Sequence, residues 1–380
     1  MPKQVKLRRG TTAQHAAFTG ALGEVTVDTT KKTVVVHDGA TPGGSPLSVE
    51  SAFAVKIGKT VWVDKTNGND GTAQRGRVDL PYLTLGAAKT AAQSGDTIIV
   101  GPGTYDEKNL LKDGVNWHFL NGAKVAYTGS AAGGIFDTSA NGSNGAVTSR
   151  ITGDGEFSLA NVTSSGHVIH SSAASSDLII NGRKMSSADP TIKIATPSGS
   201  CEVNVTTVTC TAGDAIQQTG NSTANTVRAQ QIDSSGGNGV RLSAGNLDVI
   251  SYKISSSAAQ AVYASGGGGT ITAHIISSSA NNAVEYNNPY NAILTIRHAR
   301  IVSTLVSTAG RAIYIATGTS GIKLVNCTLV ANATAPAATT SIDALAAATV
   351  HLHGESVANI AKGANVTVAV SALTVNAAVV

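Results

Sequence analysis

The feature that most constrains this chain is an internal repeat of apolar residues in its second half. One set of aliphatic anchors recurs at intervals of 25, 22, 22, 22, 25, 28 and 28 residues: Ile180, Val205, Val227, Val249, Ile271, Ile296, Leu324 and Leu352. A second set keeps the same phase: Ile192, Ile216, Val240, Val262, Val284, Ile313 and Ile342. Two sets that stay in phase over so long a stretch indicate that one structural unit is repeated.

Each repeat also carries an aliphatic or sulfur-containing residue five positions after its first anchor. These residues are Met185, Cys210, Ile232, Ile254, Ile276, Ile301, Leu329 and Val357. In three neighbouring repeats, Ile232, Ile254 and Ile276 each begin a similar serine-rich phrase. Strands joined by turns rich in Ser, Gly and Asn are typical of the coils of a β-solenoid.

The repeat predicts an all-β fold, a parallel β-helix in which no coil can bury its inner face alone. Stacking coils about 4.8 Å apart places like residues above one another, so the anchors should line the interior. The general chirality of parallel connections favours right-handed winding. The composition agrees, because only 13% of residues are charged and 4% are aromatic, while small and β-branched residues dominate.

The charge distribution argues against a nucleic-acid partner. Residues 1–65 hold nine Lys or Arg and five Asp or Glu, a net of +4, and the remainder balances at 18 against 18. No basic stripe therefore follows the repeats. The three cysteines, Cys201, Cys210 and Cys327, have neither disulfide-framework nor zinc-site spacing, and we expect small buried side chains.

The sequence predicts neither a membrane span nor a secretory signal. No apolar run reaches the length of about 18 residues that a span requires, and Met-Pro-Lys at the start leads into no apolar segment. We therefore expect synthesis in a host cytoplasm without a signal peptide. Gly266–Gly269 lacks the Lys-Ser/Thr and the helix start of a phosphate-binding loop, and no cofactor is predicted.

Four regions of the chain differ in composition and residue pattern. They are a small β-rich domain at 1–50, a linker at 51–59, a capping helix with the first coils at 60–145, and a repetitive shaft with an end cap at 146–380. Helical spacing over Leu83–Gln93 predicts the capping helix. Its shared face would consist of Leu83, Ala87, Thr90 and Ala91.

The capping helix is followed by Gly95-Asp96, by an apolar strand at Thr97–Val100, and by a Pro-Gly-Thr-Tyr turn that ends at Tyr105. This order resembles the start of pectate-lyase-like right-handed β-helices. With the repeats, the resemblance covers residues 60–380 and implies a capped solenoid. The family's lyase residues cannot be matched here residue by residue, so no catalytic residue is assigned.

Three segments near the N-terminus, Val5–Gln14, Gly23–Thr29 and Val34–Ala40, form a second ordered set. They resemble the small N-terminal domain of phage tail fibres and tropism determinants, with His15 where an aromatic usually follows the first segment. The resemblance implies a β-rich, normally trimeric domain that fixes a fibre to other tail or baseplate proteins. Combined with the solenoid, it implies a tail fibre or tailspike in the virion tail that contacts a host-surface glycan.

The C-terminal sequence independently predicts self-association. The chain ends in apolar strands, Val366–Val370 and Leu373–Val380, and no charged residue follows Lys362. The last coil of a solenoid exposes unpaired strand backbone and an apolar interior. Identical chains about a threefold axis would cover this end as a homotrimer, and the alternative is a tail that folds back over its own chain.

One residue after each second anchor should point outward, and these residues form a ladder. Its members are Lys193, Gln217, Arg241, Tyr263, Glu285, Tyr314 and Asp343. Arg241, Tyr263, Glu285 and Tyr314 occupy adjacent rungs and suit a sugar, because rings stack on sugar faces and charged groups bond hydroxyls. A subunit interface, where Tyr and Arg are also enriched, and a plain solvated face stay open as alternatives.

A second candidate site is a His-x-His pair near the C-terminus. His351, His353 and Glu355 alternate along a predicted strand and would share one face. Three chains meeting there would offer six imidazoles to a transition metal. The alternative is a set of surface or interface histidines.

An enzymatic role is left open but is not favoured. Glycoside hydrolysis needs two carboxylates about 5–9.5 Å apart. From residue 178 onward there are eight acidic residues, and Asp233 with Asp248 is the nearest cross-coil pair. The sequence thus favours a structural, receptor-binding tail protein over a tailspike polysaccharide depolymerase. A bacterial surface adhesin is the third reading, and the missing secretion signal counts against it.

Overall fold

The computed structural model describes residues 6–47, 59–129, 133–138, 147–160, 166–173, 176–195, 198–222, 224–288, 292–305, 311–317, 320–330, 342–344, 348–353 and 366–371. They belong to two compact units: the first comprises residues up to Gly58 and Gly76–Asp79, and the second comprises Lys59–Arg75 and the residues from Leu80 onward. The finer division at 50, 59 and 145 stays a prediction. None of the helices in the described ranges is long and apolar enough to cross a membrane.

The N-terminal unit is a four-stranded sheet with one short helix. Its elements are β1 (Arg8–Gly10), α1 (Thr12–Ala16), β2 (Val25–Asp28), β3 (Thr33–Val36) and β4 (Ser45–Pro46). The strands follow one another in the order β1-β2-β3-β4, with β1 parallel to β2 and the other pairs antiparallel. The predicted β-rich N-terminal domain is confirmed.

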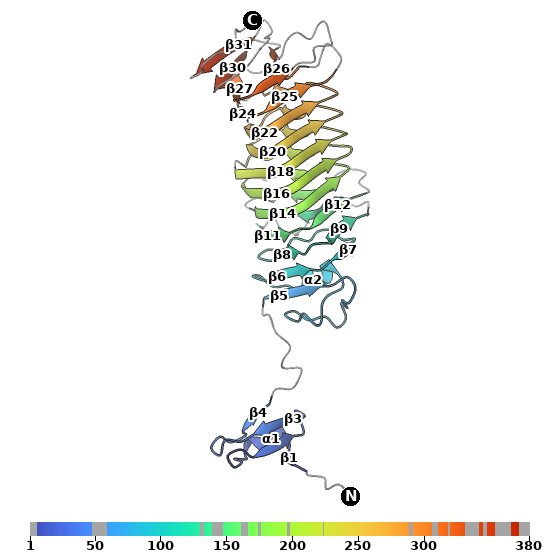
Figure 1. Ribbon diagram of the computed structural model, residues 1–380, viewed down its shortest axis with the longest axis vertical. Coiled ribbons are helices and arrows are strands. Elements are labelled where there is room, and N and C mark those ends of the chain that lie inside the picture. The colour runs from blue at the N-terminus through green and yellow to red at the C-terminus, as the bar shows by residue number, and fades with distance from the viewer. Residues whose placement is uncertain are drawn as a thin grey trace. The chain divides into compact units, whose positions relative to one another are not determined.

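The second unit is a parallel β-solenoid built from two sheets, with its strands stacked coil upon coil in Figure 1. The nine-stranded sheet contains β10 (Gly133–Asp137), β13 (Gly166–Ser171), β15 (Ile192–Ile194), β17 (Ile216–Gln218), β19 (Val240–Leu242), β21 (Val262–Ala264), β23 (Val284–Asn287), β26 (Ile313–Thr317) and β29 (Ile342–Ala344). Each strand pairs in parallel with the next, so the all-β parallel solenoid is confirmed. Right-handed winding stays a prediction.

The eighteen-stranded sheet supplies the rest of each coil. Its strands are β5 (Thr60–Val63), β6 (Thr97–Val100), β7 (Gly103–Tyr105), β8 (Asn116–Phe119), β9 (Ala123–Tyr127), β11 (Thr148–Gly153), β12 (Glu156–Leu159), β14 (Ser176–Ser187), β16 (Gly199–Cys210), β18 (Ala224–Ser234), β20 (Leu247–Ser256), β22 (Gly269–Ser278), β24 (Leu294–Arg297), β25 (Arg300–Ser303), β27 (Ser320–Val325), β28 (Thr328–Val330), β30 (Ala348–His353) and β31 (Val366–Ser371).

The aliphatic anchors stack as predicted, with one correction. Val227, Val249 and Ile271 are directly paired and fully buried. Ile180, however, pairs with Val203 rather than Val205, and the residue five positions on is Val208 rather than Cys210. Strand side chains alternate with a period of two, so a two-residue slip keeps the same inward face and the sequence pattern cannot detect it.

The second set of anchors needs no correction. Ile192, Ile216, Val240, Val262, Val284, Ile313 and Ile342 pair in succession along the nine-stranded sheet. The three cysteines are buried and free, as predicted. Burial raises the pKa of the Cys201 thiol to about 12, which makes this side chain an inert part of the core.

The capping helix is shorter than predicted, and its most buried side chains are not the predicted ones. α2 spans Leu85–Ala91, with Thr84 as its N-cap, and its buried side chains are Leu85 and Ala88. Of the predicted face, Ala87 and Ala91 are partly buried and pack against the core, whereas Leu83 lies before the helix begins and Thr90 is exposed. The Thr84 hydroxyl accepts the Ala87 backbone N–H and thereby sets the start of the helix two residues later.

Candidate functional site

The predicted outward ladder lies on the nine-stranded sheet in the expected register. Lys193, Gln217, Arg241, Tyr263, Glu285, Tyr314 and Asp343 are paired in succession. The same row continues to His170 and Asp137 in the preceding coils. The side chain of Asp343 lies outside the described residues. Six predicted rungs therefore share one row whose described side chains are half-buried.

Two arginines lie over the two tyrosine rings of this ladder. The Arg241 guanidinium carbon is 5.7 Å from the centre of the Tyr263 ring, and that of Arg311 is 5.0 Å from the Tyr314 ring. Arg241 also lies 3.9 Å from a carboxylate oxygen of buried Asp214. Cation–π contacts of this kind fix the rings in place. Arg311 is a member that the sequence pattern missed, because it lies in the turn before β26 rather than on a strand.

Glu285 lies between the two tyrosines and is positioned by amides of the preceding turns. Gln260 Nε2 and Asn282 Nδ2 donate to Glu285 Oε2 over 2.6 Å and 3.3 Å. Tyr263 and Tyr314 are two rungs apart, about 10 Å along the stack, which is comparable to a disaccharide. The ladder thus offers two ring faces and one carboxylate, and its use as a glycan site or as an interface stays a prediction.

The predicted metal site cannot be compared with the structure. Glu355 lies outside the described residues, and of His351 and His353 only the backbone is described, on β30. Both histidines occupy alternate positions of that strand, as expected. Among the residues that the structure does describe, no group of three or more His, Cys, Asp or Glu is placed to hold a metal ion.

The carboxylates considered for glycoside cleavage are not brought together. Asp248 lies opposite Thr226, seven residues before Asp233 on β18. At about 3.3 Å per strand residue, the two carboxylates are on the order of 20 Å apart, well beyond the separation that hydrolysis needs. Asp233 instead lies 3.6 Å from Lys253, and Asp248 accepts the Thr270 N–H.

A groove on the eighteen-stranded sheet was missed from the sequence. Its volume is about 450 Å³, and it follows the serine-rich phrases after Ile232, Ile254 and Ile276. The repeated serines were visible in the sequence, but an outward hollow depends on how the turns that follow these strands are stacked. The repeated serine-rich phrase was the sequence feature that could have indicated this groove.

Polar residues in and beside the three N-terminal segments singled out in the sequence have structural roles. Thr11 and Gln14 form a capping box at the start of α1. The Thr12 hydroxyl donates to Asp28 over 2.7 Å. Hydrogen bonds from Thr41 hold the pKa of the Asp38 carboxyl well below its usual range. These residues therefore fix the turns of the sheet rather than carry chemistry.

A buried polar chain links α1 to the sheet. The Gly20 N–H donates to His37 Nδ1, so His37 Nε2 carries the hydrogen and donates to Thr26 Oγ1 over 3.0 Å. The Thr26 hydroxyl can then donate to His15 Nε2 over 2.8 Å, and His15 Nδ1 donates to the Thr11 carbonyl. A Cβ at Gly20 would lie 2.5 Å from the His37 ring, so only glycine fits there. His15 is thus a central member of this network.

This N-terminal unit is the part of the chain that comparison with known proteins recognises. Residues 5–41 match the major tropism determinant N-terminal domain. A tail fiber receptor-binding protein of Bordetella phage BPP-1 is 55% identical over 73 residues, which cover 18% of this chain and 19% of that protein. The chain therefore matches about a fifth of the length of that relative. No solved structure matches it.

Proposed function

We propose that this chain is a bacteriophage tail-fibre protein that joins the virion through its N-terminal unit and presents its solenoid to a receptor on the host surface. The observation that carries the proposal is the 55% identity to a receptor-binding tail fibre protein, together with the tropism-determinant match at residues 5–41. A rigid parallel solenoid suits a shaft that must span a distance and carry repeated surface groups. A place in the virion tail follows from the same similarity.

The composition of the N-terminal unit supports self-association, which we infer to be a homotrimer. Among its described residues, Val35 is the only large aliphatic side chain that is fully buried. Val25 and Val36 are directly paired across β2 and β3, yet both are more than a third exposed. Leu47, which follows β4, is 56% exposed. A unit this small rarely folds on so little core, and identical copies would bury the exposed face.

The solenoid is further inferred to be of the pectate-lyase-like, right-handed type found in tailspikes. The support is local: α2 precedes the buried strand β6, and β7 follows it, so the segment Gly103–Tyr105 that was expected to be a turn is a short strand in the same order along the chain. Partners in the tail or baseplate would bind residues 1–50. Loss of virion incorporation on replacing those residues is the direct test of that attachment.

An adsorption experiment tests the receptor-binding role. Purified full-length protein added to a susceptible bacterium should reduce adsorption of the phage that carries it, because free fibres occupy the receptor. Unchanged adsorption at saturating protein would overturn the proposal. Oligosaccharides released during the same incubation would instead support the polysaccharide depolymerase.

The tyrosine ladder is proposed as one point of glycan contact. Tyr263→Ala removes a half-exposed ring without creating an internal cavity, so thermal stability should hold while competition for adsorption weakens about tenfold, in line with the loss of a stacking contact of about 1.4 kcal/mol. Lys193→Ala, two coils away from Arg241 on the same row, is the matched control. Equal competition by both variants would leave Tyr263 without a role in the receptor site.

A further inference from the structure

One hollow of the solenoid, of about 450 Å³, is an axial groove lined mainly by serine and threonine residues. We call it the serine groove. It crosses the ends of β16, β18, β20 and β22, and Ser235, Ser257, Ser279 and Thr304, the residue after β25, line it in successive coils. The only carboxylate among its lining residues is Asp233. Coils about 4.8 Å apart therefore present hydroxyls at a regular spacing close to the rise of one sugar in an extended chain.

The floor of the serine groove is fixed by hydrogen bonds within the turns. Ser234, Ser256 and Ser278 are buried, and each donates to a turn carbonyl over 2.6–2.7 Å. Each also accepts an N–H of its own turn. The hydroxyls of the floor serines thus already have hydrogen-bond partners within the protein. The outer serines, such as Ser257 and Ser279, are exposed, so their hydroxyls are accessible to a ligand.

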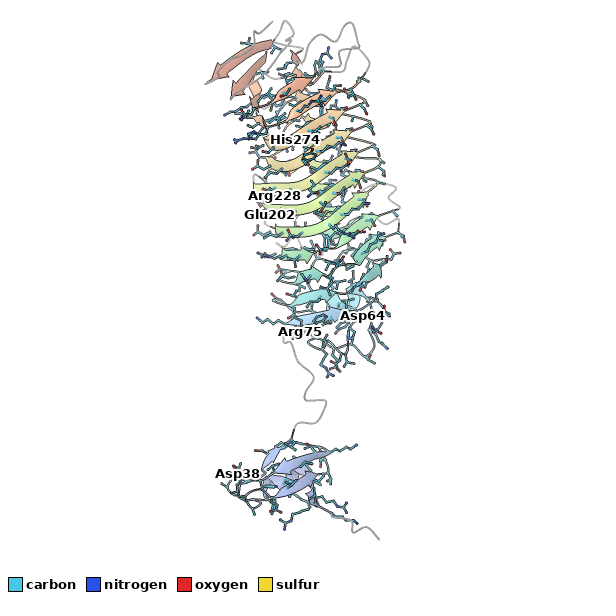
Figure 2. The ribbon with its side chains drawn as sticks, in the orientation of Figure 1. Asp38, Asp64, Arg75, Glu202, Arg228 and His274 are labelled. Carbon is cyan, nitrogen blue, oxygen red and sulfur yellow. The ribbon has the colours of Figure 1, made fainter. Side chains whose placement is uncertain are left out.

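Charge is balanced on the outer face of this sheet in the middle coils. Arg183 pairs with Glu156, Arg228 lies 2.5 Å from Glu202, and Lys253 lies 3.6 Å from Asp233. Figure 2 shows Glu202 and Arg228 on neighbouring strands, with His274 farther along the same stack. Coulomb repulsion between the cations is therefore relieved locally by interleaved carboxylates.

The balance is lost toward the C-terminal end of the serine groove. Strands β22, β24, β25, β27 and β28 contain no Asp or Glu. Arg297 and Arg300 are exposed, and neither they nor Lys323 has an ion-pair partner among the described residues. Arg300 is paired with Ile275 on β22. Ile275 is the outward-facing residue that comes two positions before the groove residue Ser277 on the same strand. Cations gathered without counter-charges lower stability slightly and attract an anion.

An aromatic platform lies beside the cations. Tyr252 is 61% exposed, and its ring stacks on His274 with centroids 5.0 Å apart and planes 18° from parallel. Tyr252 also lines a second hollow, of about 370 Å³, with Gln230 and Gln231. Ring faces, amides and hydroxyls together form the surface that carbohydrates prefer, and unpaired guanidinium groups add a preference for carboxylate or phosphate.

We propose that the serine groove binds an extended anionic polysaccharide, with sugar hydroxyls along the serines and acidic groups at Arg297 and Arg300. This inference rests on the proposed receptor-binding function and names its ligand class and site. The ligand's charge comes from carboxylates or phosphates, both of which suit the arginine fork. The serine groove lies on the eighteen-stranded sheet and the tyrosine ladder lies on the nine-stranded sheet, so the two surfaces can be tested separately.

Binding of the full-length protein to three immobilised polymers tests the charge requirement. Alginate carries carboxylates, a teichoic acid carries phosphates, and dextran is neutral. We expect at least one charged polymer to bind about tenfold more tightly than dextran, and to weaken as salt rises from about 0.05 M to 0.5 M, because added ions screen exposed charges. Equal binding to dextran, or no binding to either charged polymer, would overturn the proposal.

Two substitutions locate the site. Arg297→Gln with Arg300→Gln should weaken binding to the charged polymer about tenfold, while Arg150→Gln, which removes another exposed arginine of the same sheet, should not. Ser257→Trp should block the groove, and Ser257→Ala should leave it open. Full binding by the double arginine variant or by Ser257→Trp would exclude this groove as the site.

The adsorption experiment separates this inference from the proposed function. If the double arginine variant blocks phage adsorption as well as the wild-type protein does, the receptor-binding role stands and the groove assignment fails. If the wild-type protein itself does not block adsorption, the proposed function fails whatever the polymers show. An altered solution mass of the double arginine variant would assign the cations to an interface between copies and would also overturn the groove assignment.

Discussion

At the scale of single residues, the N-terminal unit depends on polar contacts more than on apolar packing. His15, Thr26 and His37 are buried and joined in one chain of hydrogen bonds in which each donor has one acceptor. Thr26 is the link between the two rings. Such a chain specifies a unique arrangement because a missing member leaves buried nitrogen atoms without partners.

Thr26→Val should therefore destabilise the N-terminal unit although it keeps the shape of the side chain. Both imidazoles lose a partner in the interior, at a cost of about 1–3 kcal/mol each. Thermal unfolding followed through this unit should begin at lower temperature. Thr26→Ser retains the hydroxyl and should stay close to the wild type. Equal stability of Thr26→Val and Thr26→Ser would refute the role of the chain.

At the scale of elements, α2 is held at both ends by side chains from distant parts of the sequence. The Glu107 carboxylate accepts the Leu85 and Gly86 N–H groups at the start of the helix. Lys112 Nζ donates to three carbonyls at its end, including that of Ala92 over 2.6 Å. Seven residues would not form a stable helix alone, so these contacts, with burial of Leu85, keep the cap in place.

The turn after α2 predicts an acid-sensitive cap. Bidentate hydrogen bonds from Arg75 hold the pKa of buried Asp96 below its ordinary 3.8. Because the folded-state pKa is the lower one, this stabilisation is present above about pH 4 and is lost as the pH falls through the folded value. Hydrogen-exchange protection of β6, followed from pH 6 downward, should hold to about pH 4 and decline below it.

Asp96→Asn is the matching substitution. It removes the buried charge that pairs with Arg75 and should cost about 2–4 kcal/mol at neutral pH. The variant should also lose less protection than the wild type on acidification. Asp154→Asn, at an exposed position, serves as the control. A wild-type acid profile in Asp96→Asn would show that another group controls the cap.

At the scale of the whole molecule, the N-terminal unit and the solenoid differ in how they bury their apolar side chains. The solenoid buries one continuous core that extends from Val61 to Val366. The N-terminal unit instead leaves Val25, Val36 and Leu47 exposed. A shaft with one continuous core and an under-packed N-terminal unit suit the proposed fibre, in which copies of the chain would associate at the virion end.

Val36→Glu should therefore reduce association of the full-length chain. A charge placed on the exposed apolar face would be desolvated at an interface, which costs several kcal/mol per copy. Mass measured in solution should fall from three chains toward one. Thr19→Glu, at another exposed position of the same unit, is the control for added charge. A wild-type mass of a single chain would refute the homotrimer itself.

The sequence by itself determined the repeat, the parallel solenoid and the outward ladder. Stacked coils force chemically similar residues into one row. The regular spacing of Val240, Val262 and Val284 in the sequence therefore follows directly from the stacking of the coils. The same logic placed Arg241, Tyr263 and Glu285 on adjacent rungs. It failed at Val205, where two inward positions on one strand are equally apolar.

Only the tertiary structure decided what depends on turns and on contacts between distant segments. The start of α2 follows from Thr84 and Glu107, and the serine groove follows from how successive turns are stacked. Neither is encoded in a local period. That the described residues place no counter-charge beside Arg297 and Arg300 emerges only when five strands are laid side by side, because electrostatic balance is a property of the assembled face.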